Sequence, residues 1–507
     1  MYEVSAFCRY ICSCVVVLIC ITACEKPNPE LIRFGLSNSI VSLDPRFATD
    51  ATSSRICRLL YEPLVKFDES FRAIGALATW RQDSPTRYLF TLEQSHQFHD
   101  GSAVTAEDVV ATYQSILDPR TASPHRGSLE LISAVYATDN RTVVFELQRA
   151  DPLFPGFLTI GIMRKSAVAK TADEKYGAMI GSGPFAMVGG WTDKHVLLKR
   201  VVDQVAVRFE TVRDPTVRAL KIVNKEIDIL QGGLAPEIVA WLDGQENIST
   251  LEHPGTTYTY MGLNLQDPYL SKHRIRKALS MALNREEIAK RLFVGRARLA
   301  KSIFTPEHWA YNPTLDEISY DPDQARAILA EFGFGPSNPL QLSYKTSSDL
   351  LRLRVATVIQ DQFAKVGVEL DIQSYDWGTF YGDIKAGRFQ VFSLSWVGLK
   401  LPDIFRYVFH SESIPPIGAN RGRYEALDID SMIEKAEYAN ELSEKIVHYR
   451  DIQAKLLEDL PYIPLWYEDH VVVLNDSIEG YSVGLDGNYD ALENTRRKTL
   501  DGARPNE

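Results

Sequence analysis

Two short segments hold the residue types that could carry out chemistry. The segment SHQFHDG brings His96 and His99 together with Asp100, and on one face of a helix this spacing could place two imidazoles on a metal ion. The pair Asp100-Gly101 instead predicts a turn, so we favour a surface strand and turn with two incidental histidines. The second segment, Gly181-Ser182-Gly183-Pro184, has a serine without an identifiable partner base and is more typical of a tight turn.

Enzyme motifs with a known mechanism are missing from the sequence. It has no G-x-S-x-G, no H-E-x-x-H and no Gly-rich phosphate loop that ends in Lys followed by Ser or Thr. We therefore predict no catalytic residues, no metal site and no cofactor. A hydrolase is an alternative that would need a nucleophile–base pair, and turnover of peptides or esters would test it.

The composition is typical of a soluble globular protein with several domains. At about 100–200 residues per domain, 507 residues indicate two or three domains. Hydrophobic residues make up 45% and charged residues 24%, and the net charge of -11 is spread without runs of like charge. Because a diffuse acidic balance disfavours binding to phosphate backbones, we predict no nucleic-acid partner. We expect a monomer.

The N-terminus is typical of an exported lipoprotein. Five of the six cysteines lie in the first 24 residues, which excludes a disulfide framework in the body, where Cys57 is expected to be buried. Residues 11–23 match a signal-peptide core and are shorter than the ~20 residues of a membrane-spanning helix. Ile21-Thr22-Ala23-Cys24 resembles a bacterial lipobox, so residues 1–23 are predicted to be cleaved and Cys24 lipidated. The body would lie in the periplasm or cell envelope, lipid-anchored to a membrane; an uncleaved short anchor gives the same placement.

Helix and strand patterns alternate along the mature chain. β-Branched and aromatic residues predict strands over 87–92, 142–148, 368–373 and 389–394. Apolar spacing and end signals predict helices over 272–293, 322–332 and 348–366, and a capping box at Thr105 and Asp108 predicts the start of another. Such alternation favours an α/β fold over a helical bundle or a β-sandwich.

Short landmarks run along the chain in a fixed order. They are Leu43-Asp44-Pro45, residues 60–64, Phe98-His99-Asp100-Gly101, residues 105–109, residues 181–185, Asn264 with residues 274–284, residues 321–333, Trp396, and Asn420-x-Gly422-x-Tyr424 with Asp430. In this order they resemble the oligopeptide- and dipeptide-binding family of importer-associated solute-binding proteins, also called bacterial extracellular solute-binding family 5. The resemblance covers nearly the whole mature chain, and FHDG followed by TAEDV is its most specific part.

The resemblance implies an α/β, two-lobe periplasmic-binding-protein fold with a hinge and an extra subdomain inserted in lobe I (cluster C type). Lobe I would comprise residues 25–265 plus 466–507, the insert about 66–180, and lobe II residues 266–465. Such a protein captures oligopeptides between its lobes and delivers them to the permease subunits of an ABC transporter. Hinge closure buries the ligand at a domain interface.

The segment that should hold the ligand's amino group departs from the family pattern. Peptide-binding relatives place an aspartate a few residues after the tryptophan that is Trp396 here, yet Leu399 occupies that position and the segment is one residue short. Asp403 could substitute if the loop is rebuilt. The arginine that dipeptide binders use for the ligand carboxylate is also absent, because Thr379 stands near its place. A buried ammonium without a counter-charge is costly, so a strict dipeptide binder is disfavoured.

The predicted ligand-binding residues are Trp396, Asp403, Trp377, Ser39, Ile40, Val41, Tyr260 and Asn264. The tryptophans could stack on the ligand, and Ser39 to Val41 could pair with a peptide backbone. The alternatives are core aromatic residues, an ordinary first loop, and a helix cap at Asp403. Arg421 and Arg423 are expected to face solvent, and Asn420 to be structural. Longer or modified peptides, an oligosaccharide and a metal chelate stay open as ligands, as does a signalling or chaperone role for the same fold.

Overall fold

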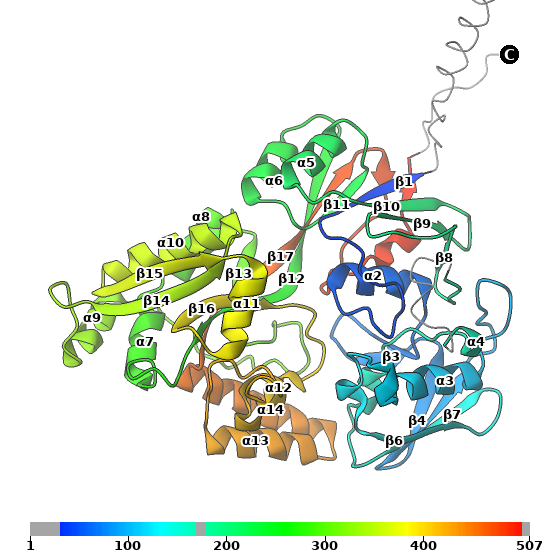
Figure 1. Ribbon diagram of the computed structural model, residues 1–507, viewed down its shortest axis with the longest axis horizontal. Coiled ribbons are helices and arrows are strands. Elements are labelled where there is room, and N and C mark those ends of the chain that lie inside the picture. Colours follow the sequence, from blue (N-terminus) through cyan, green and yellow to red (C-terminus); the bar gives the residue numbers. More distant parts are fainter. Residues whose placement is uncertain (1–30, 169–178, 499–507) are drawn as a thin grey trace, which may run out of the picture.

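One large sheet runs through both halves of the molecule, and helices cover it (Figure 1). The structure is a computed structural model that describes residues 31–168 and 179–498. The predicted signal peptide and Cys24 lie outside these residues. Helices and strands alternate along the chain, so the predicted α/β class is confirmed. Within the described residues, no helix is long and apolar enough to cross a membrane.

Two long strands connect the halves. β12 (Ile248–Leu263) and β17 (Tyr462–Asn475) run antiparallel along most of their length, with a register shift between His253 and Thr257. One end of this pair lies in each half, as Figure 1 shows. We call the half that contains residue 31 lobe I and the other half lobe II. A pair of shared strands is a connection that can twist, so it is suited to a hinge.

Lobe I is built from both ends of the described chain. Its central strand, β1 (Ile32–Leu36), lies parallel to β10 (Ala206–Thr211) and β11 (Ile229–Gln231), and its side chains are mostly buried. The other elements are β8 (Phe185–Met187), β9 (His195–Arg200), α2 (Ala51–Leu60), α5 (Pro215–Val223), α6 (Pro236–Asp243), β18 (Ile478–Glu479) and β19 (Arg496–Arg497). Val472 and Leu474 of β17 complete this core.

A subdomain with its own sheet projects from lobe I. Its antiparallel strands follow the order β4 (Ala78–Ser84), β5 (Arg87–Leu92), β7 (Thr142–Leu147), β6 (Ile132–Ala137), beside α3 (Ala106–Leu117), β2 (Val65–Phe67), β3 (Ala73–Gly75) and α4 (Lys165–Val168). The strands predicted over 87–92 and 142–148 are confirmed to within one residue. The capping box is also confirmed, because the Thr105 N–H donates to the Asp108 carboxylate at 2.9 Å.

Lobe II contributes three parallel strands to its end of the sheet. β14 (Leu340–Ser347) lies between β15 (Val368–Tyr375) and β16 (Val391–Trp396). The remaining elements are α7 (His273–Met281), α8 (Arg285–Leu292), β13 (Ala297–Leu299), α9 (Pro322–Glu331), α10 (Leu350–Ala364), α11 (Trp377–Ala386), α12 (Ile404–Phe409), α13 (Leu427–Tyr438) and α14 (Leu442–Asp459). The whole sheet has the order β15-β14-β16-β12-β17-β11-β1-β10-β9-β8, and β13 pairs with β17.

The helix predicted over 272–293 is wrong as a single element. The chain ends α7 at Met281 and starts α8 after Asn284, whose side chain accepts the N–H of Glu287 at 2.9 Å. This capping bond replaces a continuous helical ladder. The strand predicted over 389–394 lies two residues later, and the helices predicted over 322–332 and 348–366 are confirmed as α9 and α10.

The break between α7 and α8 turns Arg285 into the interior of lobe II. The side chain is buried, and its guanidinium donates to the backbone carbonyls of Ala300 and Pro464 at 2.9 Å each. A third bond reaches the carbonyl of Ile318, also at 2.9 Å. Arg285 therefore joins three separate segments of the chain.

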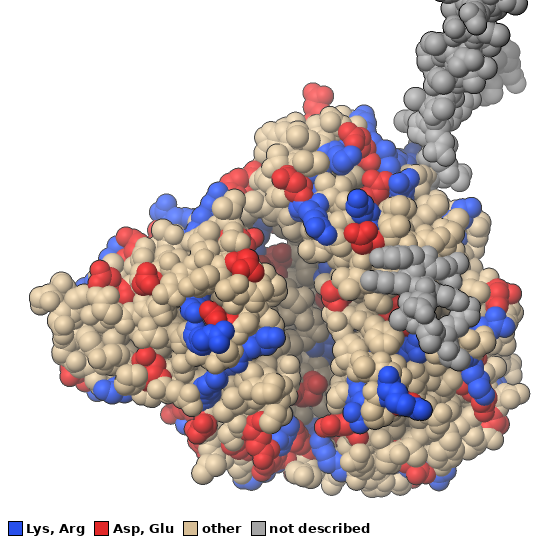
Figure 2. Space-filling view, in the orientation of Figure 1, with Lys and Arg blue, Asp and Glu red and all other residues tan. Residues whose placement is uncertain are grey.

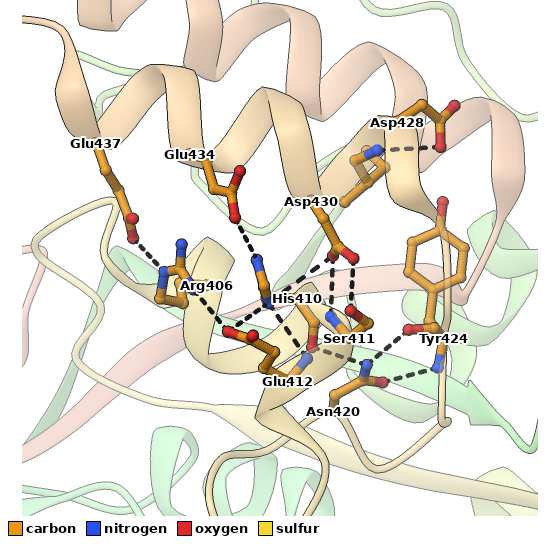
Figure 3. Close-up of polar contacts among 11 residues, drawn as sticks. Arg406, His410, Ser411, Glu412, Asn420, Tyr424, Asp428, Asp430, Glu434 and Glu437 are labelled. Carbon is orange, nitrogen blue, oxygen red and sulfur yellow. Dashed lines mark hydrogen bonds and ion pairs between the residues drawn. The ribbon is translucent and has the colours of Figure 1, made fainter.

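The loop around Asn420 is a structural motif of lobe II (Figure 3). The Asn420 amide donates to the backbone carbonyls of His410 and Tyr424 and accepts the N–H of Tyr424 at 2.9 Å. Asp430 on α13 accepts the N–H of Ser411 at 2.9 Å. These bonds fix the chain between 410 and 424 against α13, so the loop has one defined shape.

The FHDG and GSGP landmarks meet in space. His99 Nε2 lies 3.0 Å from the Gly183 carbonyl oxygen, and its Nδ1 accepts the N–H of Gly181 at 3.2 Å. Both ring nitrogens are therefore engaged, burial lowers the pKa of His99, and the neutral ring acts as a structural link. His96 instead contacts Glu62 at 3.0 Å. In the part of the chain that the structure covers, no group of three or more His, Cys, Asp or Glu could hold a metal ion.

Gly183 fits this junction because it lacks a side chain. A Cβ there would collide with the Leu59 carbonyl oxygen and with the backbone of Leu60. We expect Gly183→Ala to lower the free energy of unfolding by about 1–3 kcal/mol, since the backbone must shift. Thermal melting would measure the change. Gly127→Ala adds a methyl group into open space and is the control, and equal melting of the two variants would contradict this expectation.

Candidate ligand-binding cleft

A cavity of about 390 Å³ lies between the two lobes. Its lobe I wall comes from α2, where Cys57 is buried as predicted, and from residues between 156 and 161 of the subdomain. Its lobe II wall is the loop at 398–404, which joins β16 to α12. Figure 2 shows the surface hollowed along the boundary between the lobes. Small-molecule sites form preferentially at such interfaces, so this cavity is the candidate site.

The loop after β16 bridges the lobes. Lys400 Nζ forms an ion pair with Asp486 of lobe I at 3.0 Å and lies 5.5 Å from the centroid of the Phe67 ring. Leu401 packs so closely on Gly156 of the subdomain that an added Cβ would lie 2.9 Å from it. The loop between β16 and α12 is thus held by contacts to the opposite lobe.

Asp403 lines the cavity from the lobe II side. Water in the cleft reaches its side chain, yet protein surrounds the carboxyl group, and this desolvation raises its pKa to about 7. The nearby carboxylates of Asp151 and Glu437 raise the pKa further. Asp403 precedes α12 without forming a side-chain capping bond, and it has no ion-pair partner among the residues that the structure describes. Its charge is therefore available to a cationic ligand.

A second bridge joins lobe II to the subdomain, where α13 and α14 lie beside it in Figure 1. Lys445 of α14 pairs with Asp151 at 3.5 Å, and both side chains are buried. The Arg149 guanidinium lies 5.5 Å from the ring centroid of Tyr438. Asp151 already has a cationic partner, so Asp403 is the carboxyl group in this region whose charge is uncompensated.

The two predicted tryptophans belong to a group of aromatic side chains that also contains Tyr381 and contacts an arginine of lobe II. Trp396 ends β16, and the Arg421 guanidinium lies 4.8 Å from its ring centroid. The same guanidinium lies 5.4 Å from the ring of Tyr381 on α11. Trp377 stacks on Tyr381, with ring centroids 5.5 Å apart and an interplanar angle of 6°. Trp377 is 59% exposed, Trp396 is half-buried, and neither lines the 390 Å³ cavity.

Tyr260 and Asn264 pack inside lobe II rather than at the cavity wall. Tyr260 is fully buried, its ring stacks on that of Tyr462 at 4.0 Å, and its hydroxyl accepts from Arg421 at 3.0 Å. The Asn264 amide donates to the carbonyl of Phe389 at 2.9 Å, which closes the turn after β12. Thr379 lies in the first turn of α11, where its N–H donates to a capping carboxylate.

Ser39, Ile40 and Val41 form the turn after β1. Ile40 is buried and its N–H donates to the Asp193 carbonyl at 3.2 Å. The N–H of Val41 donates to a serine hydroxyl of α2 at 3.0 Å, and the Ser39 hydroxyl accepts from Arg213 at 2.7 Å. Because the N–H groups of Ile40 and Val41 already donate hydrogen bonds within the protein, pairing with a peptide backbone would use the carbonyl oxygens of this turn.

Sequence analysis missed the contacts of two charged residues of lobe II, Arg421 and Lys400. The expectation that Arg421 faces solvent is wrong, because the Asn420 loop turns it inward and leaves its side chain 6% exposed. Lys400 follows the expected aspartate position and reaches the other lobe. No local sequence pattern around Arg421 or Lys400 predicts these contacts, because their partners lie far away in the sequence.

The chain matches the bacterial extracellular solute-binding proteins, family 5 (middle region), over residues 72–413. It is 25% identical over 502 residues to di/tripeptide-binding protein 2 of Pseudomonas aeruginosa, covering 91% of this chain and 94% of that protein. The substrate-binding protein CtaP of Listeria monocytogenes superposes with a TM-score of 0.83 at 24% identity, covering 92% of this chain and 99% of that one. NikZ from Campylobacter jejuni, solved with Ni(L-His), gives a TM-score of 0.79 at 23% identity, covering 92% and 100%.

The fold and the cleft define the class as a two-lobed α/β binding protein of the cluster C type, as predicted. The chain belongs to the bacterial extracellular solute-binding proteins, family 5. The resemblance drawn from the ordered landmarks is therefore confirmed.

Proposed function

We propose that this protein is the extracytoplasmic binding component of an ABC transporter, which captures peptides between its lobes and delivers them to the permease. Asp403 carries the proposal, because it places an uncompensated carboxyl group in the cavity between the lobes. The amino terminus of a peptide is a cation that needs such a counter-charge once water is excluded. The resemblance to the Pseudomonas aeruginosa di/tripeptide-binding protein supports this assignment.

The size of the cavity is consistent with a short ligand. At about 390 Å³ it lies at the lower end of the usual range for small-molecule sites, which is about 300–1,000 Å³. Closure of lobe II, about 266–465, on lobe I, about 25–265 plus 466–507, would bring more of both walls onto a peptide. Trp396 and Trp377 would then cover the ligand from the lobe II side.

The sequence supports a location for this activity. Residues 1–23 serve as a lipoprotein signal peptide, and Cys24 carries the lipid anchor that keeps the body at the membrane of the periplasm or cell envelope. The protein acts as a monomer on its solute and the permease, without catalysis, cofactor or metal.

A non-peptide solute is the second candidate. Leu399 stands where peptide-binding relatives have a carboxylate, and Lys400 beside it is held by Asp486. These residues lower the negative charge of the loop, which suits an oligosaccharide or another ligand without an ammonium group. NikZ shows that a structural neighbour binds a nickel–histidine chelate.

Thermal melting tests whether the solute is a peptide or a non-peptide molecule. The soluble body, from about Lys26 onward, is mixed with peptide pools whose amino termini are free or acetylated. A ligand at 100 times its dissociation constant adds about 2.7 kcal/mol to the folded state, which gives a clear rise in melting temperature. We expect the free peptides to raise it.

The other two outcomes distinguish a peptide without a free amino terminus from a non-peptide solute. A rise with acetylated peptides alone would mean that Asp403 does not bind an amino terminus. The absence of a rise with either pool, in protein freed of carried-over ligand by unfolding and refolding, would reject the peptide function in favour of a non-peptide solute.

A further inference from the structure

Arg421 is a buried cation without an acidic partner. Its side chain is 6% exposed, and no carboxylate of the described residues forms an ion pair with it. Its hydrogen bonds go to two phenols, Tyr260 at 3.0 Å and Tyr381 at 3.2 Å. Removing a guanidinium from water without a counter-ion costs several kcal/mol, so such a site is stabilised when an anion binds there.

The aromatic neighbours orient this cation but do not neutralise it. The Arg421 guanidinium lies 4.8 Å from the ring centroid of Trp396 and 5.4 Å from that of Tyr381. The two rings contribute cation–π attraction and fix the plane of the guanidinium. Two of about five N–H donors are used by the phenols, so donors are left for a ligand. The buried indole Nε1 of Trp396 also has no hydrogen-bond partner.

Arg421 lies where α/β proteins place ligands. The strands β14, β15 and β16 are parallel, so their carboxyl ends meet at one edge of the sheet. Trp396 is the last residue of β16, and α11 with Tyr381 follows β15 directly. The loop that lines the interlobe cavity begins two residues after Trp396. Ligands of open α/β sheets bind outside the carboxyl ends of the strands.

We propose that Arg421, with the Nε1 group of Trp396, binds a carboxylate of the transported solute. This site takes the anionic end of the ligand, while Asp403 takes a cationic end. The solute class is then one that carries both charges, such as a peptide with a free carboxyl terminus or an acidic side chain. The proposal rests on the proposed peptide-binding function.

The test compares peptides that differ in one negative charge. Pools of two to five residues are prepared with a free carboxyl terminus, with a terminal amide, and with a terminal amide plus one internal glutamate. Dissociation constants are measured by calorimetry on the wild-type body and on Arg421→Gln, Arg421→Lys and Arg423→Gln. Arg423 is the matched control, because it lies in the same loop and bonds the carbonyl of Ala386 at the far end of α11.

We expect the wild type to bind the free-acid pool at least about 30-fold more tightly than the amide pool. Arg421→Gln should abolish this preference, Arg421→Lys should keep part of it, and Arg423→Gln should keep all of it. Recovery of affinity with the internal glutamate would assign the carboxylate to a side chain rather than to the terminus.

Three results would overturn the proposal in distinguishable ways. Equal binding of acid, amide and glutamate pools by the wild type rejects the Arg421 site and leaves the peptide function standing. A preference that survives in Arg421→Gln places the anion elsewhere. Failure of every pool to bind the wild type rejects the peptide function itself. If Arg421→Gln melts far below the wild type, its binding data are set aside. The proposal is then tested by the preference of the wild type for the free-acid pool over the amide pool and by the partial preference expected for Arg421→Lys.

Discussion

Asp403→Asn is expected to weaken binding of peptides with a free amino terminus by about 30-fold or more, and to raise the melting temperature of the ligand-free protein. The amide cannot provide the counter-charge that the peptide ammonium needs in the cavity. In the absence of ligand, it also no longer places a desolvated carboxylate near Asp151 and Glu437. One substitution thus exchanges ligand affinity for stability.

The pH dependence of both effects follows from the raised pKa. The carboxyl group of Asp403 has a pKa of about 7 in the folded protein and about 3.9 in the unfolded chain. As pH rises through this window the unfolded chain loses the proton first, so the wild type loses stability that Asp403→Asn retains. The difference in melting temperature between the two proteins should grow from about pH 4 to about pH 7 and then level off. Peptide affinity of the wild type should rise over the upper part of the same window.

Melting curves and calorimetric titrations at a series of pH values check these expectations. Asp361→Asn is the control, because that carboxylate lies on the surface of α10 in an ion pair with Lys365. The assignment of Asp403 would be contradicted by a peptide affinity that is independent of pH between about 5 and 8, or by an Asp403→Asn variant that binds like the control.

Arg285→Ala is expected to lower the free energy of unfolding by at least about 3 kcal/mol. The substitution removes the donor for the buried carbonyls of Ala300 and Pro464 and for the partly buried carbonyl of Ile318. Each unsatisfied group costs about 1–3 kcal/mol, and the missing side chain also leaves a cavity. Because one of these carbonyls belongs to β17, the loss should also loosen the hinge strand.

Denaturant unfolding followed by tryptophan fluorescence measures this loss. Arg291→Ala on the same helix is the control, because its side chain is exposed and pairs with Glu287 one turn away. A shared unfolding midpoint for the two variants would show that the three carbonyls find other donors.

Local signals predicted much of the fold. The capping box at Thr105, the alternating strand predicted over 368–373 and the proline and glycine at the ends of α9 act within a few residues, so they can be read from sequence. The structure extends that strand to Tyr375. The break between α7 and α8 escaped prediction, because Ala282 and Leu283 continue the apolar period of the preceding helix. The decisive contacts there are made by Arg285 with carbonyls up to 179 residues away.

The cleft was predicted less completely, because its properties depend on groups brought together by both lobes. Asp403 was identified, but its raised pKa comes mainly from burial between the lobes, with a further contribution from Asp151 of the subdomain. Arg421 was expected to face solvent because charged side chains usually do, whereas the bonds of Asn420 hold the loop in which Arg421 is buried. The pairing of Lys400 with Asp486 spans 86 residues and leaves no trace in local spacing.

The position of β17 sets the time at which the protein can fold. Ile463, Leu465 and Trp466 complete the core of lobe II, while Val472 and Leu474 complete that of lobe I. Neither lobe is finished until residues 462–475 have left the ribosome, close to the end of the 507-residue chain. The cores of the two lobes therefore stay open while residues up to 461 are made, whereas the core of the subdomain, residues 64–162, contains no residue of β17. The order of the elements thus predicts that the subdomain can fold first and that the two lobes close together, after β17 has been made.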